Sequence, residues 1–105
     1  MTNIEKIVTT VKRATDYQIN KRILKEKIEI DLHFAYAGGL FRAGPELIVF
    51  ASLWTDSPLY IEDTYQNPVE IADPKEFETV AREHYQKVMN RWHQQHEELK
   101  RIRKV

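Results

Sequence analysis

The sequence lacks cysteine, has only three glycines and four prolines among its 105 residues, and contains no long apolar run. Its longest apolar stretch, residues 47–54, includes Ser52 and is far too short to cross a bilayer. The amino terminus does not show the charged and then apolar pattern of a signal peptide. Because disulfides are typical of oxidising compartments, the missing cysteine favours the cell interior. We therefore expect a soluble, cytoplasmic protein that does not contact a membrane.

What is present is an ordinary globular composition, with 42% apolar and 30% charged residues. This balance excludes a disordered polyelectrolyte and a collagen-like repeat. A chain of this length has room for only one hydrophobic core. Residues 1–105 are therefore predicted to form a single domain.

Charge is distributed unevenly along the chain, although 16 basic and 16 acidic residues cancel overall. Residues 1–27 have a net charge of +4, residues 28–79 of −8 and residues 80–105 of +4. The preferred interpretation is that the basic terminal segments, including the tail 100–105, fold over the acidic middle and neutralise it. The alternative leaves at least one basic segment free to bind a partner.

The first part of the chain predicts two helices joined by a short turn. Apolar residues three and four positions apart indicate a helix over residues 3–14, with Thr2 or Asn3 as its N-cap. The same spacing, with more basic residues, indicates a second helix over residues 17–25.

A strand is predicted next. Apolar and polar residues alternate over residues 27–36, which favours a strand with one buried face. The competing interpretation is a helix that continues from Tyr17 and ends at Gly38, since glycine commonly follows a helix in the left-handed conformation.

The middle of the chain predicts a short helix and a β-hairpin. The residues Gly44-Pro45-Glu46 are typical of a helix start, so residues 47–54 are predicted as a short buried helix, with a central strand as the lesser alternative. Turn residues bound two strand-like runs that can pair as a hairpin, residues 59–63 and 69–71. Pro68 would then lie at a strand edge or at the start of a strand, because it cannot donate to the ladder.

A long C-terminal helix is the clearest element. Asp73 as N-cap, Pro74 at the first position and Glu76 three residues after the cap form a capping box with proline. An apolar stripe then continues without Gly or Pro, which predicts one helix over residues 74–102, about 43 Å long at 1.5 Å per residue. The predicted fold class is α+β: a helix-dominated single domain with a small antiparallel sheet or hairpin and this long helix.

The apolar stripe of the long helix is the predicted contact surface, because a helix of this length overshoots a globule with a radius of gyration of about 13 Å. Trp and Tyr are also enriched at protein interfaces. We expect another protein or a second copy of the chain as the partner, with a homo-oligomer as the expected assembly. The predicted partner-binding residues are Tyr85, Trp92, Leu99 and Ile102 on the helix and Tyr65 in a polar turn.

A metal site is weakly supported. His93, His96 and Glu97 are close enough in the sequence to share one side of the long helix. Helical zinc motifs, however, place their histidines at i and i+4, and no further ligand is evident from the spacing. The preferred interpretation is a solvated polar face, so we predict no metal and no cofactor.

Catalytic residues are equally weakly supported. Glu62, Asp63 and Glu70 could form a carboxylate pair, but they flank turns, where solvated acids are common. No Gly-rich phosphate loop, cysteine nucleophile or serine elbow is present. We therefore predict that the protein is not an enzyme.

Nucleic-acid binding is the alternative function. Two short helices followed by a strand would resemble a helix-turn-helix with a wing, in which basic side chains contact phosphates. The candidate residues are Lys21, Arg22, Lys25, Lys100, Arg101, Arg103 and Lys104. A neutral overall charge argues against strong attraction to a polyanion.

Two stretches, residues 38–48 and 67–71, resemble small uncharacterised proteins of T-even-like tailed phages, particularly those that infect marine cyanobacteria. This resemblance carries no catalytic motif and transfers no functional residue. It implies a short phage accessory or assembly protein in the cytoplasm of a host cell. Together with the missing enzyme signatures, it favours a non-enzymatic protein-interaction or assembly accessory protein.

Overall fold

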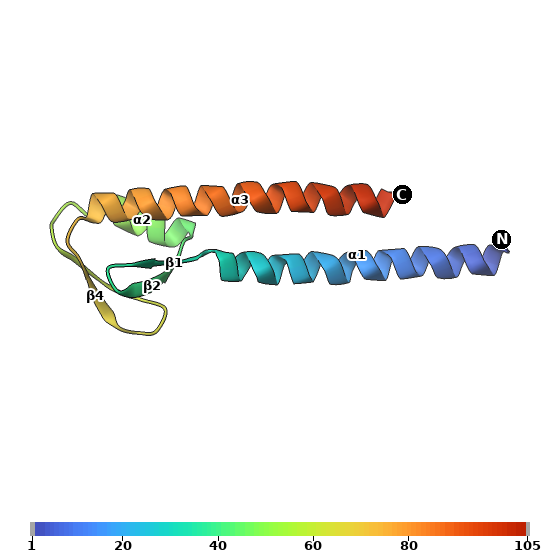
Figure 1. The fold of residues 1–105 in the computed structure, drawn as a ribbon, viewed down its shortest axis with the longest axis horizontal. Helices are drawn as coiled ribbons and strands as arrows, with labels where there is room; N and C mark the ends of the chain where they lie inside the picture. The colour runs from blue at the N-terminus through green and yellow to red at the C-terminus, as the bar shows by residue number, and fades with distance from the viewer. Residues whose placement is uncertain (1, 105) are drawn as a thin grey trace.

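The structure is a computed structural model that describes the backbone of residues 2–104 and the side chains of residues 2–102. Two long antiparallel helices form a stem, and the short elements between them gather at one end as a head, residues 32–73 (Figure 1). The molecule measures 69 × 23 × 18 Å and has a Cα radius of gyration of 19.9 Å. The elements in chain order are α1 (Asn3–Asp31), β1 (His33–Tyr36), β2 (Gly39–Arg42), α2 (Pro45–Leu53), β3 (Leu59–Glu62), β4 (Pro68–Ile71) and α3 (Pro74–Lys104).

The fold class is α+β, as predicted, with helices dominating two small antiparallel sheets. The long C-terminal helix is also confirmed. Asp73 Oδ1 accepts a hydrogen bond from the backbone N–H of Glu76 at 3.1 Å, so the predicted cap is formed at the start of α3. No proline follows Pro74 within α3, so the helix continues without a break to Lys104.

α1 is one continuous helix, so the prediction of separate helices over residues 3–14 and 17–25 is wrong. No Gly or Pro interrupts residues 3–31. The polar residues Thr15 and Asp16, between the two predicted helices, do not by themselves stop a helix whose next turns are packed. Its start is as predicted. The Thr2 hydroxyl accepts from the Glu5 backbone N–H, and the Glu5 carboxylate accepts from the Thr2 N–H, forming a capping box.

The strand predicted over residues 27–36 is shortened to β1, because α1 continues through most of the range. Ile28 and Leu32, one helical turn apart, are 0% and 2% exposed, whereas Ile30 between them is 71% exposed. A strand would have directed all three side chains to the same face. Packing against α3 therefore selects the helix, although it ends before Gly38, the end expected in the competing interpretation.

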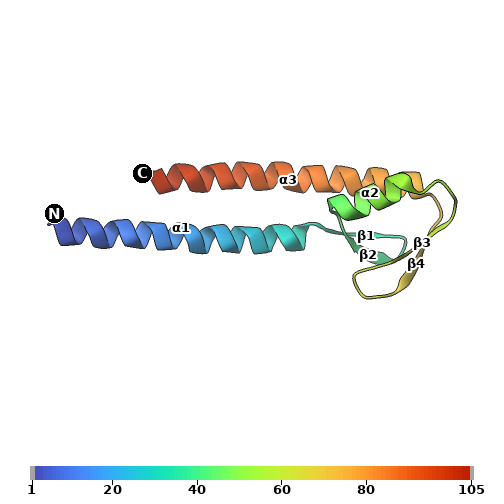
Figure 2. The ribbon, with the colours of Figure 1, turned by 180° about the vertical axis from the view of Figure 1, so that it is seen from behind.

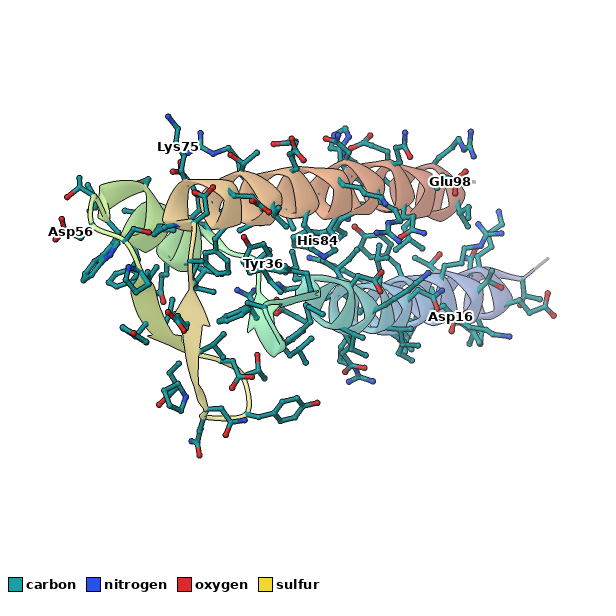
Figure 3. The ribbon with its side chains drawn as sticks, turned by 60° about the vertical axis from the view of Figure 1, so that its left-hand side comes forward. Asp16, Tyr36, Asp56, Lys75, His84 and Glu98 are labelled. Carbon is teal, nitrogen blue, oxygen red and sulfur yellow. The ribbon has the colours of Figure 1, made fainter. Side chains whose placement is uncertain are left out.

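Two histidines satisfy carbonyl groups in the last turn of α1. The Nδ1 of His33 lies 3.0 Å from the carbonyl oxygen of Glu29. The Nε2 of His84, on the side of α3 that faces α1, lies 2.7 Å from the carbonyl oxygen of Asp31 (Figure 3). Because a carbonyl oxygen only accepts, each ring nitrogen donates. These two side chains cap the C-terminal end of α1, a role that a glycine often has.

The two β-hairpins are built differently. β1 and β2 pair through a tight turn at Ala37 and Gly38, whose positive φ angles of 50° and 82° suit a right-handed twisted hairpin. β3 and β4 pair as predicted, and Pro68 begins β4 opposite Glu62.

The hydrophobic core lies where both hairpins and α2 meet the first turns of α3. Phe77, on α3, is fully buried, and its ring centroid lies 5.0 Å from that of Phe41 and 5.9 Å from that of Phe34. A second cluster in the stem joins Ile28 of α1, and Leu32 directly after this helix, to Val88 of α3. Tyr85 packs against both clusters and makes head and stem continuous.

Candidate functional site

The apolar stripe of α3 is largely covered by α1. Tyr85 and Trp92 pack in the stem, and half-buried Leu99 lines a surface hollow together with Tyr17 of α1. The stripe is therefore packed within the stem over much of its length. Of the five predicted partner-binding residues, only Ile102 and Tyr65 are strongly exposed, at 66% and 70%.

The exposed apolar surface lies instead on the first turns of α1. Ile4, Ile7, Val8 and Val11, which we call the tip face, are 75%, 62%, 61% and 60% exposed. Their spacing of three and four residues places them on one side of the helix. Both views of the ribbon show the start of α1 extending beyond the end of α3, so no other element of the described residues covers this segment (Figures 1 and 2).

The tip face has a defined end along α1. The positions that continue the same side of the helix are the polar residues Thr15, Gln18 and Arg22. An isolated helical segment of only a few turns is marginally stable in water. The capping box and continuity with the packed stem hold this segment in helical form and keep its apolar side in solvent.

A second exposed apolar surface lies on the head. We call Val49, Phe50, Leu53 and Trp54 the head patch; they are 55%, 45%, 75% and 40% exposed. The rings of Phe50 and Trp54 lie 5.9 Å apart. α2 was predicted as a buried helix, but only Ala51 is fully buried in it, so that part of the prediction is wrong. A helix that is apolar all round normally has partners on every side.

Two carboxylates border the head patch. Glu46 precedes Val49 by one turn of α2, and Asp56 follows Trp54 in the loop at the outer end of the head (Figure 3). Both side chains are exposed, and neither forms an ion pair within the part of the chain that the structure describes. The head patch therefore has an acidic border.

The basic C-terminal tail does not reach the acidic middle of the chain, so the tail's part in the preferred interpretation of the charge pattern is wrong. Other residues of the basic segments do meet it, since Lys25 pairs with Glu29 and Arg91 lies 3.6 Å from Asp31. α3 ends at the opposite end of the stem from the head (Figure 1). Lys100 pairs with Glu97 at 3.0 Å and Arg101 with Glu98 at 3.3 Å, one turn back on the same helix. The Lys100 ammonium lowers the pKa of Glu97. The side chains of Arg103 and Lys104 lie outside the described residues.

The helix-turn-helix of the nucleic-acid alternative is not formed, because α1 is unbroken. Lys25 pairs with Glu29 at 2.6 Å and lies 4.8 Å above the Trp92 ring, so two neighbours already engage its charge. Lys21 lies beside it on a groove of about 470 Å³, whereas Arg22 borders a different hollow. The predicted phosphate contacts therefore do not converge on one surface.

The carboxylates considered for catalysis are separated by the hairpin register. Glu70 lies opposite Tyr60 rather than Glu62, and both glutamates are exposed. Asp63 is 7% exposed and accepts backbone N–H bonds from Leu40, Tyr65 and Asn67 at 2.9 to 3.1 Å. These bonds, with that of Asn67 the largest contribution, lower the pKa of Asp63. Its role in the fold is to join the turn between β3 and β4 to β2.

The histidines of the long helix form no dense cluster. His93 Nε2 lies 3.9 Å from Glu97 Oε1, and both His93 and His96 line the groove together with Met89 and Trp92. Among the described residues, no group of three or more His, Asp or Glu side chains could together hold a metal ion.

The sequence matches no protein-family model, and no curated protein or solved structure is significantly similar to it. None of the helices in the described part of the chain combines the length and apolarity needed to cross a membrane. The candidate site therefore rests on geometry alone. It consists of the tip face and the head patch, at the two ends of the molecule.

Proposed function

We propose that this chain is a non-enzymatic protein-interaction or assembly protein whose stem presents the tip face to another protein chain. The observation that carries the proposal is the set of four apolar side chains, each 60% to 75% exposed, on a helix end that packs against no other element in the described part of the chain. Contiguous exposed apolar surface commonly marks a binding site, and an amphipathic helix binds by laying its apolar face against a partner.

Two features of the sequence support this proposal. The resemblance to small proteins of tailed phages implies an accessory or assembly role rather than catalysis. The lack of cysteine fits a reducing cytoplasm, where such a protein would act. Nucleic-acid binding is the weaker candidate, because the basic side chains proposed for it that the structure describes are paired locally or line different hollows.

Site-specific crosslinking in cells that naturally produce the protein tests the function. A photo-reactive amino acid replaces Val8 in the tip face, and a matched control replaces Thr10, which lies on the other side of the same turns. We expect protein adducts from position 8 at a clear excess over position 10, whether the captured chain is a second copy or another protein.

Two results would contradict the proposed function. Equal yields of protein adducts at positions 8 and 10 would show that the apolar side of α1 has no preferred contact. Adducts formed only with nucleic acid would instead favour the alternative function.

A further inference from the structure

We propose that the tip face of one copy docks on the head patch of a second copy, so that the chain assembles through a tip-to-head contact. The inference rests on the proposed function and names the partner of that same surface. Both surfaces are apolar, and both lack a partner within the described part of the chain. Each spans about two helical turns, so the two can pack as helix against helix.

A single copy cannot make this contact within itself. The tip face lies at the free end of the stem and the head patch at the other end of a molecule 69 Å long (Figures 1 and 2). α1 and α3 pack side by side along the stem through the Ile28 cluster, which holds the two ends apart. The two surfaces can meet only between copies.

Charge favours this pairing over contact between two tips. Residues 2–13 contain three basic residues and one acidic residue, a net charge of +2. The head patch is bordered by Glu46 and Asp56, within a segment, residues 28–79, whose net charge is −8. Opposite charges steer tip to head, whereas two tips would place like charges against each other.

The contact should be weak enough to be reversible. A few turns of helix on each side offer less area than the roughly 1,600 Å² of a standard stable interface. Association is therefore expected to depend on concentration, within the range from about 1 μM to about 1 mM. Salt should also weaken it, because charge contributes to the pairing.

Two purified double variants test the contact, each altering only one surface. The tip variant is Ile7→Gln with Val11→Gln, and the head variant is Val49→Gln with Leu53→Gln. These side chains are 55% to 75% exposed and the replacement is neutral, so fold and net charge should be preserved. Thr10→Gln and Ser52→Gln are matched controls on the same helices. Circular dichroism and thermal melting confirm that all variants remain folded.

Sedimentation velocity then measures association of each protein alone and in a mixture. The wild type and the controls should associate as concentration rises, and each double variant alone should associate roughly tenfold or more weakly, because apolar contact is lost. An equimolar mixture of the two variants should recover association. The intact tip of the head variant meets the intact head of the tip variant, and growth stops at two copies.

Different results overturn the inference. A head variant that associates like the wild type, with no gain on mixing, would indicate contact between two tips. Association that strengthens between about 0.15 M and about 1 M sodium chloride would also indicate contact between two tips, because screening relieves the repulsion between their like charges. A wild type that stays monomeric throughout would exclude a second copy. Crosslinks from position 8 to a different protein would then leave the proposed function standing while this inference fails.

Discussion

At the scale of single residues, Asp63 shows how a carboxylate in a turn can be structural. Three backbone N–H groups donate to it, from β2 and from the turn between β3 and β4. Hydrogen bonds to the charged form favour ionisation, which is why its pKa lies below the ordinary value of 3.8. Folding therefore stabilises the deprotonated form of the Asp63 carboxyl group relative to its protonated form.

Asp63→Asn should lower the melting temperature at neutral pH, because an amide nitrogen cannot accept the bonds that one carboxylate oxygen accepts. The lowered pKa sets the direction of the pH effect. Stability from Asp63 is complete above pH 3.8 and is lost as pH falls through the folded-state pKa. The variant should therefore lose less stability than the wild type on acidification. Thermal melts from neutral to acid pH measure this, with Glu62→Gln as the exposed control; parallel pH profiles would contradict it.

At the scale of elements, the chain between residues 27 and 36 shows why alternation misled the prediction. Ile28, Ile30 and Leu32 fit a strand by their period of two, and also fit a helix if Ile30 is allowed to face solvent. The local sequence pattern does not show which distant residues pack against this segment. Val88, more than fifty residues away, completes the buried cluster and decides in favour of the helix.

Paired alanine substitutions distinguish the two readings of this segment. Ile28→Ala removes a fully buried side chain from the stem cluster and should cost about 2–5 kcal/mol of unfolding free energy. Ile30→Ala removes a side chain that is 71% exposed and should change stability by no more than about 0.5 kcal/mol. Urea denaturation followed by circular dichroism measures both. Similar losses for the two variants would indicate a common buried face.

The end of α3 nearest the head was predictable because its signal is local. A cap, a proline and an acidic residue act within one turn, and no distant partner is needed. Asp73→Ala should cost about 1 kcal/mol through loss of the bond from the Glu76 N–H. Asp73→Asn, which keeps an acceptor, should cost less. A thermal melt of the alanine variant that matches the wild type would contradict this prediction.

The candidate site was less predictable than the fold because exposure depends on which helices overlap. The Tyr85 to Ile102 stripe and the tip face both read as amphipathic helix, and the sequence does not state which stretch lacks a partner. A signal for the head patch was present. The segment from Leu47 to Leu53 is apolar on every side, which a small domain cannot cover completely.

At the scale of the whole molecule, the long stem keeps basic and acidic segments of the chain apart. The stem holds its basic tail far from the acidic head, so the neutral total conceals two regions of opposite sign. Near the junction of stem and head, two ion pairs join neighbouring elements among the described residues. Glu29 on α1 accepts from Arg42 on β2 at 2.9 Å, and Arg42, followed by Lys25, lowers the pKa of Glu29 to about 2. Arg91 lies 3.6 Å from Asp31.

Deleting residues 100–105 should therefore leave the unfolding free energy nearly unchanged. The described side chains of this tail pair with Glu97 and Glu98 on their own exposed helix, and such surface pairs contribute little. Arg42→Gln is the matched comparison, because it removes a cation that joins head to stem. It should cost less than about 1 kcal/mol, since both partners are partly solvated, and the cost should shrink with added salt. Denaturant unfolding at low and high salt measures both variants. A salt-sensitive loss on deleting the tail, larger than that of Arg42→Gln, would show that the tail interacts with the acidic segment after all.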